Sequence, residues 1–228
     1  MDVEITIQNV SLVGDWEPID EAKGVVLFVH ESKNNQLYLR NTYVAKELQK
    51  KGIATLLFGL LTEEEDKTKE LRFDIDLLTE RLIGVTKWCM ESEKINGIKI
   101  GYFGSGTWTA AALSGAAYWG TKIAAVVSWG GKPNLVLNEL DLIEAPTLLI
   151  TGGEEKEIID LNRKAYIKLG CIKKMEIVPG ATHLFEEPGA FEKIVELAGN
   201  WFERCFLANG VEKRIATNGQ EKRSKQIA

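Results

Sequence analysis

A sharp corner at residues 104–108 is the first feature of the sequence that could carry chemistry. Residues 98–113 read IKIGYFGSGTWTAAAL, an apolar strand that passes a Gly-Ser-Gly corner into an alanine-rich helix. Such a corner presents one side chain at its tip, the arrangement called a nucleophile elbow and usually written G-x-S-x-G. The matching positions here are Gly104, Ser105, Gly106, Thr107 and Trp108. A glycine, Gly106, therefore occupies the position of the nucleophile.

Proton-transfer chemistry is indicated by a histidine and an acid later in the chain. The chain has two histidines, His30 and His183, and each closes or follows a predicted strand. Histidine is the side chain best suited to proton transfer near neutral pH. An acidic pair, Glu154 and Glu155, lies between the corner and His183. Nucleophile, acid and histidine is the order in which α/β-hydrolases carry these groups along the chain.

Alternating strands and helices must position these residues. Five continuous apolar runs are typical of strands buried on both faces, and a sixth run at 174–178 is partly exposed. The five runs cover residues 24–30, 53–60, 98–103, 123–129 and 146–151. Helical spacing of apolar residues predicts helices over 37–51, 74–94, 109–119, 157–169 and 191–206.

Two further segments complete the expected organisation. Residues 3–13 alternate apolar and polar and predict one more strand, which ends in a turn at Gly14, Asp15 and Pro18. Residues 62–70 carry seven charges in nine residues and predict a solvated loop. The pattern favours an α/β fold, a doubly wound and mainly parallel sheet of about seven to eight strands, with ligands at the carboxyl ends of the strands. We expect a single domain over residues 1–208 and a disordered polar tail over 209–228.

Composition excludes several classes of function. A net charge of −5 without a basic stripe argues against nucleic acid or an anionic membrane surface as the main partner. The partner that we expect is a small-molecule substrate or ligand. The histidines lack the spacing of a metal site, no P-loop or complete GxGxxG motif is present, and we expect no metal or cofactor. Three scattered cysteines, the absence of a signal-like start and the absence of a long apolar run predict a cytoplasmic protein. The oligomeric state is not readable from the sequence.

Several segments in the right order resemble one known family. They are GVVLFVHESKN, IATLLFGLLTEEE, LRFDIDLLTERL, GYFGSGTWTAAAL, VVSWGGKPNL, APTLLITGGEE and VPGATHLFEEPGA. Together they look like the dienelactone-hydrolase-like branch of the α/β-hydrolase fold, over about residues 20–207. The resemblance implies an eight-stranded sheet with one antiparallel edge, and acyl chemistry on esters, lactones or similar substrates.

The resemblance also implies roles for individual residues. His183 matches the catalytic histidine of the family, and Glu155 matches the acid that orients it, where the family more often has aspartate. Gly106 stands at the nucleophile position, and a glycine cannot be a nucleophile. Trp108 replaces the last small residue of the elbow.

The predicted pocket departs from the family pattern at a second place. The residue after His30 would supply a backbone N–H to the oxyanion, and here it is Glu31, where the family tends to have glycine. A carboxylate there would oppose oxyanion stabilisation unless it points away. The pocket residues that we expect are His30, Glu31, Thr107, Trp108 and Trp129.

Three hypotheses for the site stay open. In the first, Ser105 is a displaced nucleophile with His183 as its base, although a serine at such a corner is more often a helix N-cap or turn residue. In the second, the protein is not catalytic, and Trp108, Trp129 and His183 line a cleft for a small ligand or a partner; simple core packing is the alternative for both tryptophans. In the third, His183 and Glu155 activate water or abstract a proton without a covalent intermediate.

Overall fold

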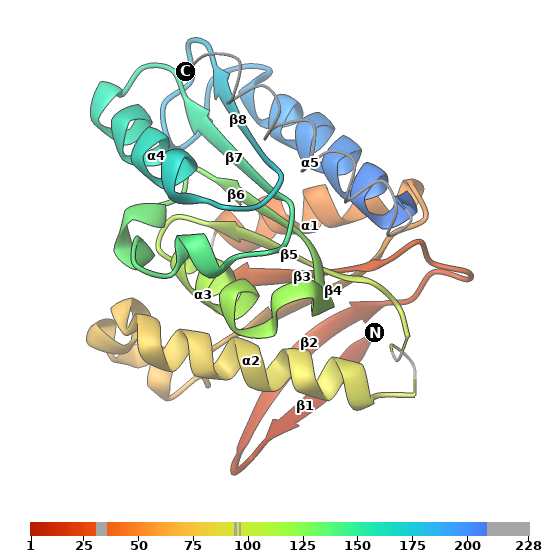
Figure 1. Cartoon of the computed structure of the whole chain (residues 1–228). Coiled ribbons are helices and arrows are strands. Elements are labelled where there is room, and N and C mark those ends of the chain that lie inside the picture. The colour runs from red at the N-terminus through yellow and green to blue at the C-terminus, as the bar shows by residue number, and fades with distance from the viewer. Residues whose placement is uncertain (31–35, 94, 96, 209–228) are drawn as a thin grey trace.

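One mainly parallel sheet organises this computed structural model, which describes residues 1–30, 36–93, 95 and 97–208 (Figure 1). Within these residues the sheet has eight strands in the order β1-β2-β4-β3-β5-β6-β7-β8. The last six strands of this order pair in parallel, whereas β1 and β2 are antiparallel. The strands are β1 (Asp2–Ile7), β2 (Val10–Glu17), β3 (Val25–His30), β4 (Ala54–Gly59), β5 (Ile100–Ser105), β6 (Ile123–Trp129), β7 (Thr147–Gly152) and β8 (Lys173–Val178). The predicted fold class is confirmed.

The N-terminal segment is a hairpin, so the prediction of one strand over residues 3–13 is wrong. β1 and β2 are joined by a two-residue turn in which Gln8 has a φ of +51°. Gly14 and Asp15, expected in a turn, pair with Val3 and Asp2 inside β2. The apolar alternation runs through the turn almost without interruption, because the paired strands place their apolar residues on the same face. The pattern therefore concealed the turn.

Helices cover both faces of the sheet (Figure 1). They are α1 (Gln36–Lys50) and α5 (Ala190–Leu207) on one face, and α2 (Ile75–Glu91), α3 (Trp108–Trp119) and α4 (Lys156–Lys168) on the other. Every residue of β3, β5, β6 and β7 is buried, as expected for strands with a helix layer on each side. No helix in the described part of the chain is both long and apolar enough to cross a membrane.

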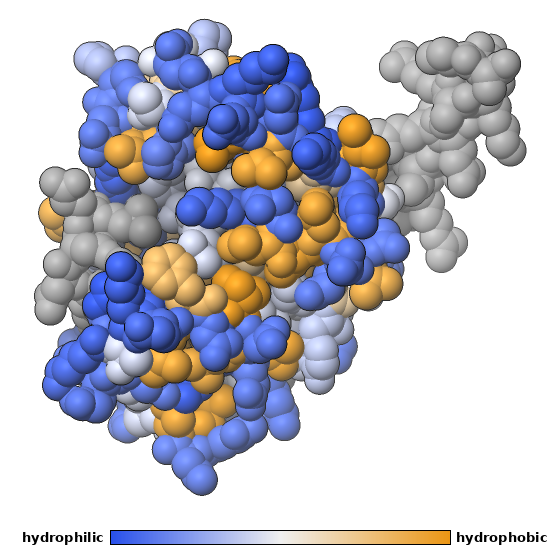
Figure 2. All heavy atoms as spheres, turned by 90° about the vertical axis from the view of Figure 1, so that its left-hand side faces the viewer, coloured by the Kyte–Doolittle hydropathy of each residue, from blue (hydrophilic) through white to orange (hydrophobic). Residues whose placement is uncertain are grey.

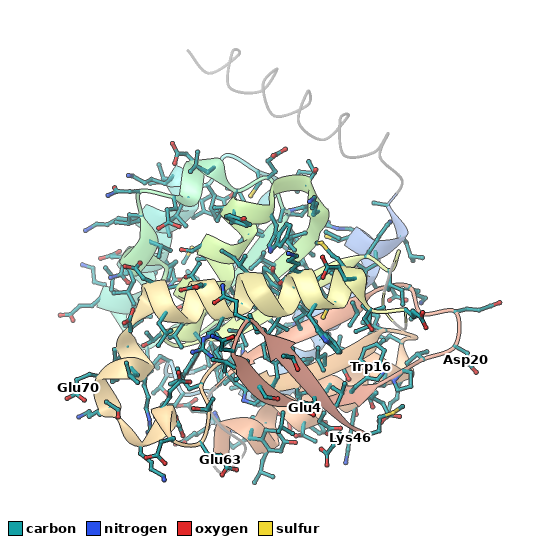
Figure 3. All side chains as sticks on the ribbon, turned by 90° about the horizontal axis from the view of Figure 1, so that it is seen from below. Glu4, Trp16, Asp20, Lys46, Glu63 and Glu70 are labelled. Carbon is teal, nitrogen blue, oxygen red and sulfur yellow. The ribbon has the colours of Figure 1, made fainter. Side chains whose placement is uncertain are left out.

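The charged segment after β4 is more ordered than predicted. It contains two short 3-10 helices, η1 (Glu65–Lys67) and η2 (Lys69–Phe73), instead of an irregular loop. Glu63 and Glu70 project from it, away from the body of the protein (Figure 3). The predictions for Glu31 and for the tail at 209–228 concern residues outside the described part of the chain.

The predicted strand–corner–helix lies at the carboxyl edge of the sheet. The chain leaves β5 at Ser105, turns at Gly106 with a φ of +52°, and enters α3 at Trp108. A Cβ atom added at Gly106 would have no heavy atom of the described residues within 4 Å, so these residues leave space beside the tip of the corner.

Two glycines at the ends of β6 and β7 let a distant loop approach the sheet. A Cβ at Gly130 would lie 2.4 Å from the carbonyl oxygen of His183. A Cβ at Gly152 would lie 2.3 and 2.4 Å from the carbonyl oxygens of Ala181 and Thr182. Real Cβ atoms do not approach backbone oxygens so closely. The backbone around His183 can therefore rest against the sheet only because both positions lack side chains.

We predict that alanine at Gly130 destabilises the fold more than alanine at Gly106. Both glycines have a φ of +52°, so each substitution carries the left-handed penalty of about 1–2 kcal/mol. Only Gly130→Ala adds a clash with His183, which must shift the loop or the strand. The free energy of unfolding, measured by urea denaturation, checks this. Equal losses in the two variants would contradict the close approach.

Candidate functional site

The centre of the site is an ion-pair-like contact between His183 and Glu155. His183 lies in the loop after β8, and Glu155 lies between β7 and the first turn of α4. The ring Nδ1 of His183 is 2.8 Å from Oε1 and 2.7 Å from Oε2 of Glu155. The backbone N–H of His183 also donates to Oε2, at 2.6 Å. A proton on Nδ1 is held by the carboxylate, which leaves the lone pair of neutral imidazole on Nε2.

The contact keeps Glu155 ionised. The backbone N–H of His183 is the largest cause and lowers the pKa of Glu155. Burial opposes it, and the ring hydrogen bond of His183, with its charge when the ring is protonated, lowers the pKa further. The side chains of His183 and Glu155 are 43% and 36% exposed, so solvent and small molecules can reach the pair. An oriented, accessible histidine with an ionised partner is suited to act as a general base.

Backbone hydrogen bonds join the loop of the acid to the loop of the histidine. The N–H of Gly153 donates to the carbonyl of Val178 at 2.9 Å, and the N–H of Glu154 donates to that of Ala181 at 3.1 Å. Glu154 contributes its backbone here, and its side chain is exposed. Of the two neighbouring acids that the sequence offers, Glu155 is the one that contacts His183.

Trp129 packs against the loop that carries His183. It is 3% exposed, and its ring packs against Phe185 at 5.9 Å and Phe191 at 5.7 Å between centroids. Phe185 is itself buried and has a φ of +50°, which is a rare conformation for a bulky residue. In this structure Trp129 is a core residue, covered by Phe185 of the loop and by Phe191 of α5, and it does not line an open cleft.

Trp108 is also a core residue and not a cleft residue. It is the first residue of α3, is 5% exposed and belongs to the hydrophobic core on the α2–α3 face of the sheet. An elbow that usually ends in a small residue accepts a tryptophan here because the indole packs into this core. Core packing, the alternative weighed for both tryptophans, is what the structure shows.

Ser105 is buried at the end of β5 and does not cap α3. It is 4% exposed, and its hydroxyl has no hydrogen-bond partner among the described residues. The N-cap position belongs to Thr107, whose side chain makes no capping hydrogen bond. The N-cap interpretation of Ser105 is therefore wrong. A buried hydroxyl is also poorly placed to meet a substrate in this conformation.

Gly106 and Thr107 are the half-buried residues at the tip of the corner. The carbonyl of Gly106 accepts a hydrogen bond from the N–H of Lys132, at 3.0 Å. Ser105 pairs in register with Trp129 in the sheet, and the next residue, Gly130, adjoins His183. The corner and His183 therefore lie on the same edge, with the end of β6 between them.

His30 differs from His183 in its surroundings. It is the last residue of β3, is 1% exposed and packs edge-on against the ring of Tyr38, with the centroids 5.4 Å apart. The structure therefore places His30 at the predicted edge but inside the protein. It does not bring the ring to the surface beside His183.

Arg40 is a residue of the site that the sequence did not reveal. From α1 it donates a hydrogen bond to the carbonyl of Leu184, lies 3.7 Å from the carboxylate of Glu186 and covers the ring of Phe191 at 5.3 Å. All three contacts are to the segment that follows His183. An arginine in the middle of a predicted helix belongs to no motif, so no sequence signal identified it.

We predict that the charge of Glu155 stabilises the fold above mildly acidic pH. An unfolded glutamate has a pKa of about 4.3, and the folded value is lower, so the stabilisation is present above that pH and is lost as the pH falls through the folded pKa. Wild type should therefore exceed Glu155→Gln in free energy of unfolding at pH 7, and the difference should shrink near pH 3. Glu154→Gln is the control, with little change at either pH. A difference that stays constant in acid would contradict the role of this charge.

Known proteins with similar structures include a dienelactone hydrolase. The crystal structure of dienelactone hydrolase from Anabaena variabilis matches 90% of this chain and 96% of that chain, with 43% sequence identity and a TM-score of 0.86. Est1E from Butyrivibrio proteoclasticus matches 91% of this chain and 99% of its own with a TM-score of 0.75, and at 12% identity it shows the fold alone. No family model matches the chain.

Curated relatives carry a different name. Two proteins of Mycobacterium tuberculosis, from strains CDC 1551 / Oshkosh and ATCC 25618 / H37Rv, are named "Putative phosphoribosyl transferase" and are each 41% identical over 201 residues. The aligned region is 88% of this chain but 45% of each of those proteins, so the chain spans about half the length of the curated relatives it matches. The 43% identity to the Anabaena protein, by contrast, extends over almost the whole of both chains, and on that ground the chain belongs to the dienelactone hydrolase family of the α/β-hydrolase fold.

Proposed function

We propose that this protein hydrolyses a small ester or lactone with water that His183 activates, without a covalent acyl-enzyme. The observation that carries the proposal is the accessible His183–Glu155 pair beside a corner whose tip has no side chain. The His183–Glu155 pair would transfer the proton. Gly106 leaves room for a small nucleophile at the position where the family has a side chain.

The proposed reaction uses His183, Glu155 and a water molecule at the carboxyl edge of the sheet. Nε2 of His183 takes a proton from water as the water oxygen bonds to the acyl carbon, and the carbonyl electrons move to oxygen. The tetrahedral intermediate then expels its alkoxide, which receives the proton from His183, and yields a carboxylic acid and an alcohol. Glu155 stabilises the transient imidazolium through Nδ1. A lactone would open to a hydroxy acid by the same steps.

The start of α3 is the best place for the oxyanion. The first N–H groups of a helix have no intrahelical partner, and the helix dipole favours negative charge there. Thr107 stands at this terminus and is half-buried, next to the open space at Gly106. Donors fixed in this way stabilise charge that develops in a transition state.

Phosphoribosyl transfer is a weaker candidate for this chain. The Mycobacterium tuberculosis proteins that carry this name are more than twice as long as their aligned region, which covers 45% of them. We propose that the name describes the part of those proteins outside the aligned region. In this chain no P-loop is present, and the accessible His183–Glu155 pair is better suited to acyl hydrolysis.

Ligand binding without turnover is the second candidate function. The observation that favours it is Gly106 itself, because loss of the nucleophile removes the usual route of the family. In either case we propose a small molecule as the partner. We propose a cytoplasmic location from the sequence, since the three scattered cysteines are buried and form no CxxC pair.

Hydrolysis by water predicts that His183 is needed and Ser105 is not. His183→Ala should lower kcat/KM for p-nitrophenyl acetate by about 100-fold or more, the usual contribution of a general base. Ser105→Ala should leave it within about twofold, because the hydroxyl is buried. Steady-state kinetics checks both variants. Retained activity in His183→Ala, or a complete loss in Ser105→Ala, would contradict the mechanism.

Restoring a hydroxyl at the corner should create a covalent nucleophile. In Gly106→Ser the new Cβ meets no atom within 4 Å in the part of the chain that the structure describes, and the left-handed backbone carries a penalty of about 1–2 kcal/mol. We expect this variant to react with a fluorophosphonate at residue 106, detected by mass spectrometry, whereas wild type stays unlabelled. The double variant with His183→Ala should lose the reaction. Labelling of wild type at Ser105 would instead support the displaced nucleophile.

A further inference from the structure

The strand β8 ends the sheet and has one open side. Within the described residues it pairs with β7 on one side and with no strand on the other. Figure 1 shows β8 at the rim of the sheet, with α4 and α5 on either side of it. The outward N–H and C=O groups of such an edge can pair with a further strand, and proteins usually protect them with charged side chains, especially lysine.

The two lysines of β8 give little of this protection. Nζ of Lys173 donates to the carbonyls of Leu169 and Ile167, at 2.6 and 3.3 Å. Nζ of Lys174 is 2.5 Å from Oε1 of Glu176. One ammonium group is therefore held at the end of α4, and the other is neutralised within the strand.

The strand presents different side chains on the two faces of the sheet. Lys174 and Glu176 line a groove beside α5. The alternate residues, Lys173, Met175 and Ile177, lie on the face that α4 covers. Ile177 is 38% exposed. The open edge therefore has a pair of opposite charges on one face and an exposed apolar side chain on the other.

A second copy of this strand fits the open edge best in one register. In an antiparallel pair, opposite residues point to the same face, so a two-fold axis must lie at a residue and not between two residues. An axis at Met175 places Lys174 of each copy opposite Glu176 of the other. An axis at Lys174 or at Glu176 would instead bring like charges together, which destabilises a strand pair.

The other charges of the groove beside α5 are nearly balanced. Nζ of Lys193 is 2.8 Å from Oε2 of Glu196, and the guanidinium of Arg204 lies 4.5 Å from the ring centre of Trp201. With Lys174 and Glu176, the groove has three cations and two carboxylates. The remaining single positive charge of each copy is a weak obstacle, because salt screens exposed charges.

The edge strand at the other end of the sheet, β1, does not offer such a pairing. Its charged side chains are the carboxylates of Asp2 and Glu4. A second copy of β1 would therefore bring only like charges to the contact. The presence of both signs of charge distinguishes β8 from β1.

We propose that two copies of this protein associate edge to edge through β8, with Lys174 of each copy facing Glu176 of the other. Ile177 then lies opposite Lys173 of the second copy, at the end of α4, where Ile167 is 77% exposed. Removal of these two apolar side chains from water adds to the backbone and charge contacts of the strands. The contact is isologous, so each of its interactions occurs twice.

Association through β8 leaves the site of each copy open. Antiparallel pairing reverses the strand direction, so the carboxyl edges of the two sheets point to opposite sides. Figure 2 shows the face at this carboxyl edge, with apolar side chains gathered across its middle, and the contact through β8 does not cover it. The inference is therefore independent of the proposed function.

The mass of the full chain in solution tests the association. In analytical ultracentrifugation, the mass should shift from that of one chain to that of two chains as the concentration rises through the micromolar range. A single-chain mass throughout this range would overturn the proposal and leave the edge to a strand of another protein.

Charge exchange tests the contact itself. Lys174→Glu and Glu176→Lys should each raise the dissociation constant of the dimer about tenfold or more, because each creates two like-charge contacts across the axis. The double variant, which exchanges the two charges, should restore the wild-type constant. Glu4→Lys on β1 is the matched control and should leave it unchanged. Single variants that associate as tightly as wild type, or a double variant that is not restored, would overturn the contact.

Disulfide formation tests the register. Opposite residues of a strand pair have Cβ atoms about 4.5–5.5 Å apart, so Met175→Cys on the axis should form a disulfide between two copies under mild oxidation. Ile177→Cys is the control, because it lies opposite Lys173 and not opposite itself. Absence of the Met175→Cys crosslink on a non-reducing gel, or an equal yield for Ile177→Cys, would overturn the register.

Discussion

The close approach of the histidine loop to the sheet is the constraint on which the site depends. The loop reaches the ends of β6 and β7 because Gly130 and Gly152 place no Cβ between the strands and the carbonyls of Ala181–His183. Only at this distance can the backbone N–H and the ring of His183 share the carboxylate of Glu155. The rings of Trp129 and Phe185 then fill the space below. The contact between His183 and Glu155 thus depends on backbone packing as much as on the two side chains.

The corner and the pair differ within one edge. The pair has an orienting acid, hydrogen bonds and access to solvent, whereas the corner has a left-handed turn with a glycine at its tip. With glycine at the tip, the strain that a nucleophile must bear in such a turn disappears. The retained pair is difficult to explain by packing alone, because both side chains are more than a third exposed. Chemistry with water or a ligand accounts for it better.

Most of the fold was predictable from periodicity, and the environment of the site was only partly so. The β6 and α3 segments were predictable because a continuous apolar run fits few structures other than a buried strand, and an alanine-rich segment fits few structures other than a helix. The β1–β2 hairpin was missed because Gln8 is not a usual turn residue. The exposure of individual side chains was the property predicted least well. The sequence indicates that Ser105 and Trp108 stand at a corner, but not the direction in which each side chain points. The contacts of Arg40 were out of reach, because no local pattern records a partner so far along the chain.

The hydrogen bond from Arg40 to Leu184 has a consequence for the order in which the site forms. Its two residues are 144 positions apart, so this contact closes one of the long loops of the chain. A ribosome-bound chain can complete the hairpin, the central strands and α3 well before Leu184 is made. Contacts of such separation form late and slowly in folding. The edge that carries His183 is therefore completed only late in synthesis, and a shorter chain that ends before Leu184 would already contain the strands of the sheet without this contact.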